Sequence, residues 1–300
     1  NKGSLLVSDI AQSIEYISLQ SKNSPVLNYP NVIDSYDSLI IVTGFRQLLV
    51  FSKNDGEFLY EISSYGRGPE EYMFVVEGYD DKEGLVFAAQ DLRNYAGFSI
   101  NGEIETTYTL PEHIFSDSLM FSVISNWRID SNTYVGYTKN HTGSYPTKIV
   151  VFNSKGEVTN RFPNYNSFQE NVDGVGGLDR WQGWFYQLQD TVRFYEDYTD
   201  TIFTVSENDI IPRYFLNMKE LSPPYHIQFV PESYKNERLE YFHLLKIRES
   251  SRLVFFYLLF ERFSHMGYYD KETKETRICD NFADKSFYAF PEYWYIRNIG

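Results

Sequence analysis

The chain has 300 residues, a net charge of −14 and 23% charged residues. This length suits either two average domains or one large all-β domain, and the composition is that of a globular protein. The acidic balance argues against a general nucleic-acid partner, because phosphate binding needs a basic face, and against charge-driven docking on an anionic membrane. The longest apolar run, Leu253 to Phe260, is far shorter than the roughly 20 residues of a membrane-spanning helix.

Aromatic residues make up 18% of the chain, with 26 Tyr and 24 Phe. These side chains favour pleated, half-buried surfaces, so the composition favours a β fold. After short strands at Val32–Ile33 and Leu39–Val42, the clearest hairpin runs from Leu48 to Ile62 and turns at Asn54-Asp55-Gly56. An Asp-Gly step tolerates the positive φ that a tight turn requires, which makes it a strong hairpin signal.

The same hairpin recurs along the chain. Close copies turn at Gly102 and Gly156, and weaker copies turn at Asn208-Asp209 and Lys271 to Thr273. Two further strands are expected before each later hairpin, at Met73–Gly78 and Leu85–Ala89, Phe121–Ile129 and Thr133–Thr138, Trp184–Leu188 and Thr191–Tyr195, and His243–Glu249 and Leu253–Phe260. A period of about 40–50 residues with four short strands is typical of β-propeller blades.

We therefore predict a single all-β domain over residues 1–300, a β-propeller of four-stranded antiparallel blades. Six blades are expected, the last incomplete at Ser286 to Ile299, and five blades are the alternative. The N-terminal segment, residues 1–30, would supply the ring-closing outer strand at Ile14–Leu19, because an open sheet edge invites aggregation. Residues 231–244, with Pro and Glu in the first turn, are expected to form a helical insertion.

The first hairpin is followed by Gly66-Arg67-Gly68-Pro69-Glu70-Glu71-Tyr72. This combination resembles an uncharacterised family of six-bladed propeller proteins from Bacteroides-type bacteria, distantly similar to NHL-type and TolB-like propellers. The likeness extends to Ser8–Leu19, Tyr198–Phe203 and Tyr268–Thr273. Members of that family usually continue beyond the position matching Gly300, which favours an incomplete sixth blade over a ring of five.

The resemblance implies a location as well as a fold. Members of the family are commonly predicted lipoproteins, so the expected location is extracytoplasmic, in the periplasm or at the outer-membrane surface. Membrane attachment would come only from a lipid anchor outside this chain. The resemblance implies no reaction, because the role of the family is not established.

The loop of Gly66, Arg67, Gly68, Pro69, Glu70 and Tyr72 allows two interpretations. Glycine-rich backbone amides can cradle a phosphate, but the P-loop pattern is absent and no Lys-Ser/Thr follows. The favoured interpretation is structural: the glycines permit tight bends, Pro69 stiffens the backbone and Tyr72 anchors the next inner strand. Glu70 or Glu71 would then pair with Arg67 or cap backbone amides.

A candidate ligand site lies at Arg180, Trp181, Trp184 and Tyr186. Alternating aromatic residues in a strand usually pack between blades, but a Trp beside polar residues and a Gly-rich loop could also form a platform for stacking sugars. The loop Asn164–Asp179 is rich in Asn, Asp and Gly, so calcium is a further candidate, although the spacing is not that of an EF-hand.

No catalytic constellation stands out. The five histidines show no zinc-ligand spacing, and both the His-Glu-x-x-His and the Gly-x-Ser-x-Gly patterns are absent. No catalytic residue and no cofactor is therefore predicted. The favoured function is a non-catalytic extracytoplasmic binding or scaffold protein whose ligand is a glycan, a peptide or a partner protein. The alternative is a hydrolase or lyase acting on a sugar or lactone in the central channel.

Overall fold

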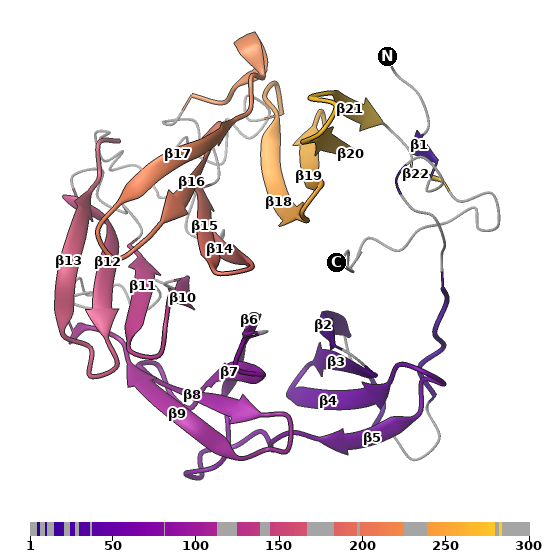
Figure 1. The fold of residues 1–300 in the computed structure, drawn as a ribbon, viewed down its shortest axis with the longest axis vertical. Helices are drawn as coiled ribbons and strands as arrows, with labels where there is room; N and C mark the ends of the chain where they lie inside the picture. Colours follow the sequence, from indigo (N-terminus) through magenta and orange to yellow (C-terminus); the bar gives the residue numbers. More distant parts are fainter. Residues whose placement is uncertain are drawn as a thin grey trace.

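The computed structural model describes residues 5–6, 10, 15–20, 25–27, 30–36, 38–80, 82–112, 125–138, 145–166, 183–196, 199–224, 239–279 and 282–283. Within these residues, five four-stranded antiparallel sheets follow one another around a common axis (Figure 1). Each sheet is a meander of four consecutive strands. The chain is therefore a β-propeller, and we number its blades one to five in chain order.

The strands are grouped by blade as follows. Blade one contains β2 (Asn31–Tyr36), β3 (Leu39–Gly44), β4 (Gln47–Ser52) and β5 (Phe58–Glu61). Blade two contains β6 (Phe74–Asp80), β7 (Leu85–Ala89), β8 (Asn94–Ser99) and β9 (Ile104–Thr109). Blade three contains β10 (Asn126–Arg128), β11 (Thr133–Tyr137), β12 (Thr147–Asn153) and β13 (Val158–Pro163). Blade four contains β14 (Gly183–Leu188), β15 (Thr191–Glu196), β16 (Thr201–Val205) and β17 (Ile210–Phe215). Blade five contains β18 (His243–Glu249), β19 (Leu253–Phe260), β20 (Phe263–Asp270) and β21 (Thr276–Cys279).

The position of a strand in its blade explains its sequence pattern. The first strand of each blade lies nearest the axis and the fourth lies at the rim (Figure 1). The second strand is covered by the neighbouring blades on both faces, and β7, with the sequence LVFAA, is buried at all five positions. The rim strand β9 instead alternates between half-buried and exposed residues along most of its length. Apolar runs therefore form middle strands, and alternating runs form rim strands.

The core lies between blades rather than within them. One apolar cluster joins Ile41 and Val50 of blade one to Val86 and Phe98 of blade two. Equivalent clusters join blade two to three, three to four, and four to five. Aromatic rings dominate these layers, and the ring centroids of Tyr108 and Tyr134, from adjacent blades, are 4.2 Å apart.

The turn glycines of three rim hairpins make an equivalent contact. Gly102 and Gly156 have φ values of 87° and 79°, which only glycine adopts without strain. A Cβ atom at Gly102 would lie 2.3 Å from the carbonyl oxygen of Ile62, just after β5, and one at Gly156 would lie 2.9 Å from that of Thr109, the last residue of β9. Each turn thus rests on the end of the preceding blade's rim strand.

Gly56, the turn glycine of blade one, rests on the N-terminal segment in the same way. A Cβ atom there would lie 2.0 Å from the carbonyl oxygen of Ser18, and the Gln20 amide donates to the Gly56 carbonyl at 2.8 Å. Residues 15–20 therefore occupy the place that a preceding rim strand would take, although no strand is assigned to them. Farther toward the N-terminus, β1 (Leu5–Leu6) pairs in parallel with β22 (Phe282–Ala283) on the side of the ring between blades five and one (Figure 1).

Two expectations from the sequence differ from the structure. The described residues form five blades, the stated alternative, instead of six, and residues 284–300 lie outside the described part of the chain. The second expectation is the helix at 231–244, of which residues 231–238 also lie outside the described part of the chain. Residues 239–241 form a turn and a bend instead of a helix, and His243 already begins β18. Residues 243 and 244 form a strand instead of a helix because Leu244 pairs with Leu258 of β19 and both side chains are buried. In the described part of the chain, no helix has the length and apolar character needed to cross a membrane.

The turn contacts lead to a stability prediction for Gly102→Ala, with Gly84→Ala as its control. Both glycines have positive φ, so Ala costs each roughly 1–2 kcal/mol of backbone strain. At Gly84 the nearest atom to a new Cβ is 3.7 Å away, whereas Gly102 faces a fixed backbone oxygen. We therefore expect Gly102→Ala to lose roughly 1–3 kcal/mol more of the free energy of unfolding than Gly84→Ala, measured by urea denaturation. Equal losses would contradict the contact.

Candidate functional site

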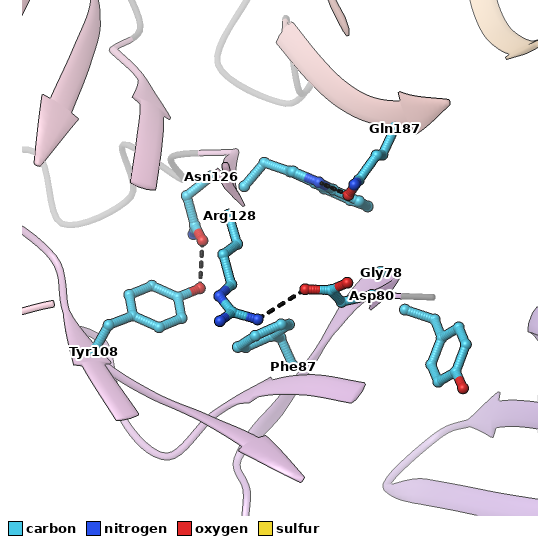
Figure 2. Close-up of a pocket in the computed structure, with 9 residues that line it drawn as sticks. Gly78, Asp80, Phe87, Tyr108, Asn126, Arg128 and Gln187 are labelled. Carbon is cyan, nitrogen blue, oxygen red and sulfur yellow. Dashed lines mark hydrogen bonds and ion pairs between the residues drawn. The ribbon is translucent and has the colours of Figure 1, made fainter. Parts of the chain in front are cut away.

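A small pocket lies where blades two, three and four meet near the axis. Its lining comes mainly from the inner strands: Gly78, Tyr79 and Asp80 from β6, Asn126, Trp127 and Arg128 from β10, and Gln187 from β14, with Phe87 and Tyr108 behind them (Figure 2). The same strand order in each blade brings the ends of successive inner strands together. The pocket is therefore built from residues far apart in the sequence.

Arg128 is the central charge of this pocket, and its side chain is only 5% exposed. Its two terminal nitrogens lie 2.8 Å from Asp80 Oδ2 and 2.8 Å from Glu83 Oε2, and Nε donates to the Asp130 carbonyl at 2.9 Å. Burial alone would lower the pKa of Arg128, but the hydrogen bond to Glu83 and the charges of both acids raise it overall. Every nitrogen of the guanidinium is thus already bound to the protein.

The neutral groups of the pocket are also bound to one another. The Tyr108 hydroxyl donates to Asn126 Oδ1 at 2.5 Å, and Trp127 Nε1 donates to Gln187 Oε1 at 3.0 Å (Figure 2). Burial raises the pKa of Tyr108 well above its ordinary value. The remaining free volume is about 20 Å³, room for about one water molecule. The pocket thus joins three blades, and its free volume leaves no room for a ligand much larger than water.

A second buried cluster joins blades three and four. Glu196, at the end of β15, is 1% exposed. Its Oε1 accepts a hydrogen bond from the Tyr137 hydroxyl at 2.8 Å, and its Oε2 lies 2.5 Å from Lys148 Nζ. Both partners belong to blade three, so the carboxylate ties its own blade to the preceding one.

A third cluster surrounds Glu249 at the end of β18, between blades four and five. The carboxylate lies 2.7 Å from Lys271 Nζ and 3.4 Å from Arg193 Nε, and accepts hydrogen bonds from the hydroxyls of Tyr186 and Tyr214. Burial alone would raise the pKa of Glu249, but the hydrogen bonds from Lys271 and Tyr214 and the two cations lower it overall. For Tyr214, burial and the Glu249 carboxylate raise the pKa to about 12.

The loop after the first hairpin binds its own carboxylate. The Gly68 amide donates to Glu71 Oε2 at 2.6 Å, and a Cβ atom at Gly66 would lie 1.9 Å from that oxygen. The rest of the loop is held by hydrogen bonds from Ser63 Oγ to the Glu70 carbonyl and from Gln90 Nε2 to the Pro69 carbonyl. The glycine-lined hollow that a phosphate would need is therefore filled by Glu71. Arg67 is exposed, and Tyr72 is buried.

The four residues of the predicted sugar platform have different environments. Trp184 is half-buried and stacks on Tyr195 with ring centroids 5.2 Å apart, and Tyr186 is 6% exposed with its hydroxyl bound to Glu249. Both lie in the packing between blades four and five. Arg180 and Trp181 lie outside the described residues, so the platform stays a prediction.

The predicted calcium loop, Asn164–Asp179, is described only as far as Asn166, whose amide donates to Asn164 Oδ1. Within the residues that the structure describes, no group of three His, Cys, Asp or Glu side chains is arranged to hold a metal ion. Calcium at this loop therefore stays a prediction.

Sequence reasoning missed the charged residues of the three clusters. The available signal was a charge inside a largely apolar strand, as at Arg193 within TVRFYE, whereas Glu249 does not stand out because His243–Arg248 already contains Lys246 and Arg248. A charge in such a position needs a buried partner. The sequence does not reveal which residue supplies it, because the partners belong to different blades.

The ion pairs of Arg128 with Asp80 and Glu83 lead to a prediction for Arg128→Met. This change leaves the Asp80 carboxylate, which is 14% exposed, without its cation. Breaking a fully buried pair costs roughly 3–5 kcal/mol of the free energy of unfolding, and we expect a loss toward the lower end because Asp80 and Glu83 keep some contact with solvent. Arg277→Met is the matched control, because the Arg277–Glu275 pair is more than half exposed and contributes at most about 1 kcal/mol. Chemical denaturation measures the free energy of unfolding of both variants. A loss for Arg128→Met no larger than that for Arg277→Met would show that the ion pairs of Arg128 do not stabilise the fold.

The lowered pKa of Glu249 predicts an acid-dependent stability. A carboxyl whose pKa is lower in the folded state stabilises the protein above its ordinary pKa of about 4.5, and this contribution disappears as the pH falls through the folded value. We expect the free energy of unfolding of Glu249→Gln to decline less steeply than that of the parent protein below about pH 4.5. Glu207→Gln, at an exposed position, should follow the parent curve. Parallel curves for all three proteins would refute this role.

Comparison with known proteins supports the fold. The chain matches the crystal structure of a predicted exported protein from Bacteroides fragilis NCTC 9343 with a TM-score of 0.64 and 17% identity, over 89% of this chain and 75% of the other. It matches a member of the DUF4221 family from Bacteroides vulgatus ATCC 8482 with a TM-score of 0.57 and 9% identity, over 87% of this chain and 82% of the other. Identities this low establish a shared fold and no shared activity.

No curated protein gives a significant match to the chain. A family model does match it, over residues 1–298. This match spans all five blades together with the N-terminal segment and the glycine loop. The chain therefore belongs to the family described as a domain of unknown function, DUF4934.

Proposed function

We propose that this propeller is a non-catalytic extracytoplasmic binding or scaffold protein whose ligand is a glycan, a peptide or a partner protein. The observation that carries the proposal is the mutual pairing of the charged groups at the three blade junctions. Arg128, Glu196 and Glu249 are each bound by side chains of a neighbouring blade. The charges of these groups are therefore paired with protein partners that join neighbouring blades.

The direction of the pKa shifts supports a binding role over a catalytic one. A general acid or base works best with a pKa near the operating pH. Here the pKa of Glu249 is lowered, and burial raises that of Tyr186 far above its ordinary value. Both shifts move the pKa values away from pH 7. Glu249 therefore stays a fixed charge, and Tyr186 stays a fixed hydrogen-bond donor.

Export, a lipid anchor and a sixth blade belong to the same proposal. The B. fragilis protein that shares the fold is named as a predicted exported protein, and the resemblance of the glycine loop implies a lipoprotein. The contact of Ser18 with Gly56 supports a sixth blade, because it repeats the contacts that Gly102 of blade two and Gly156 of blade three make with the preceding rim strand. Residues 15–20 would then be the rim strand of that blade.

A combined binding and turnover assay tests the proposed function. The intact protein is incubated with panels of oligosaccharides, peptides and sugar lactones, with and without Ca²⁺, while the melting temperature and the products are followed. At 100 times its Kd, a bound ligand adds about 2.7 kcal/mol of stability. We expect at least one compound to raise the melting temperature and to be recovered unchanged by mass spectrometry. Accumulation of a hydrolysis or elimination product, or a panel without any binder, would refute the proposal.

A further inference from the structure

The turn between β3 and β4 has a side chain where glycine is normally found. The turn consists of Phe45 and Arg46, between the last paired residues Gly44 and Gln47. Arg46 has a φ of 61°, in the left-handed region that disfavours residues with a Cβ atom. Backbone strain of this kind concentrates at functional sites. A side chain kept in such a conformation raises the question of what it does.

The guanidinium of Arg46 lies against two aromatic rings. Its Cζ atom is 4.9 Å from the ring centroid of Phe45 and 4.5 Å from that of Tyr65. Tyr65 immediately precedes the glycine loop and packs edge-on against buried Tyr72 with centroids 6.2 Å apart. We call Phe45, Arg46 and Tyr65 the clasp. All three are exposed, Phe45 by 61% and Tyr65 by 37%.

The charge of the clasp is open. In the described part of the chain, Arg46 has no hydrogen bond or ion pair to a carboxylate, and its contacts are the two rings. The chain as a whole has a net charge of −14, so carboxylates are in excess over cations. Rings on the guanidinium faces leave the in-plane N–H groups free to donate, and a fork of such donors matches a carboxylate.

Further exposed apolar residues lie on the same face of the ring. The turn at Phe45 and the start of β6 are at the same end of their blades, because β4 runs away from that turn and β5 runs back toward it. Phe74, which begins β6, is 52% exposed, and Leu92, in the turn between β7 and β8, is 68% exposed. Phe74 and Leu92 therefore add exposed apolar surface on blade two to the face that carries the clasp.

We infer that the clasp binds a polypeptide segment of a partner protein that offers one carboxylate flanked by apolar side chains. The carboxylate would pair with the Arg46 guanidinium, and the flanking side chains would cover the rings of Phe45 and Tyr65. The inference rests on the proposed binding function and assigns it a surface and a ligand chemistry.

A glycan fits the clasp less well than a peptide. A small-molecule site combines its apolar surface with several placed polar groups, whereas Phe74 and Leu92, on the same face as the clasp, are apolar. A polyanionic glycan would also be repelled by the net charge of −14. A segment with a single carboxylate avoids most of this repulsion and uses the apolar surface.

The experiment begins with panning a phage-displayed library of random dodecapeptides on the intact protein. We expect the selected peptides to share an Asp or Glu next to apolar residues. One selected peptide is then labelled, and its Kd is measured by fluorescence anisotropy for the parent protein and for Arg46→Gln. Loss of a charge-assisted hydrogen bond should weaken binding roughly tenfold or more. A peptide with Asn or Gln at the acidic position should bind the parent protein as weakly as the original peptide binds Arg46→Gln. Combining the altered peptide with Arg46→Gln should weaken binding no further.

Two further variants separate recognition from stability and from net charge. Arg161→Gln removes the same charge from an exposed position on β13 and should leave the Kd unchanged. Arg46→Gly suits the positive φ of the turn, so it should fold at least as stably as the parent protein and still lose binding. A variant that loses binding without losing stability cannot be explained by a structural role of Arg46.

The inference would be overturned by any of the following results: no enriched peptide, peptides without an acidic residue, equal losses for Arg161→Gln and Arg46→Gln, or, when the same proteins are tested on a glycan array, a glycan whose binding depends on Arg46. A selected peptide that binds Arg46→Gln as well as the parent protein would also overturn it, while the proposed binding function would stand. Turnover of a substrate in the panel assay would refute the proposed function itself.

Discussion

Face-to-face packing of neighbouring sheets is the constraint on which the ring depends. The middle strands are buried on both faces, as β7 is at all five positions, so no blade can remove its apolar surface from water alone. Sheets arranged around an axis diverge toward the rim, and broad flat side chains fill the widening space. The stacking of Tyr108 on Tyr134 across one such layer shows why this chain is so rich in Tyr and Phe.

The buried charges add specificity to this apolar packing. A carboxylate with its cation contributes little net stability, because desolvation offsets much of the attraction. An unpaired one is costly, so each cluster disfavours any arrangement in which the wrong blades meet. Glu249 illustrates this, since its two cations and two phenols are arranged around it from two blades. We interpret the clusters as the selective part of each junction.

Much of the fold could be predicted from the sequence, because it depends on local signals. The turns at Gly56, Gly102 and Gly156 were predictable from the need for positive φ, and β7, β18 and β19 have the predicted bounds. The charged clusters were not, because partners such as Arg128 and Asp80 are 48 positions apart and meet only once the ring forms. The clasp was also missed, since Phe45 and Arg46 are not turn-forming residues and their proximity to Tyr65 is tertiary.

The turns at Gly102 and Gly156 rest on the backbone of the preceding blade, and this has a consequence for how such a chain can diversify. These contacts are made through main-chain atoms, so they do not depend on which side chains surround them. The repeated turns are 46 to 64 residues apart, and extra length falls in the other connections. Loops on the faces of the ring can therefore lengthen and acquire new partners, while the rim hairpins stay short, with four or five residues between their strands.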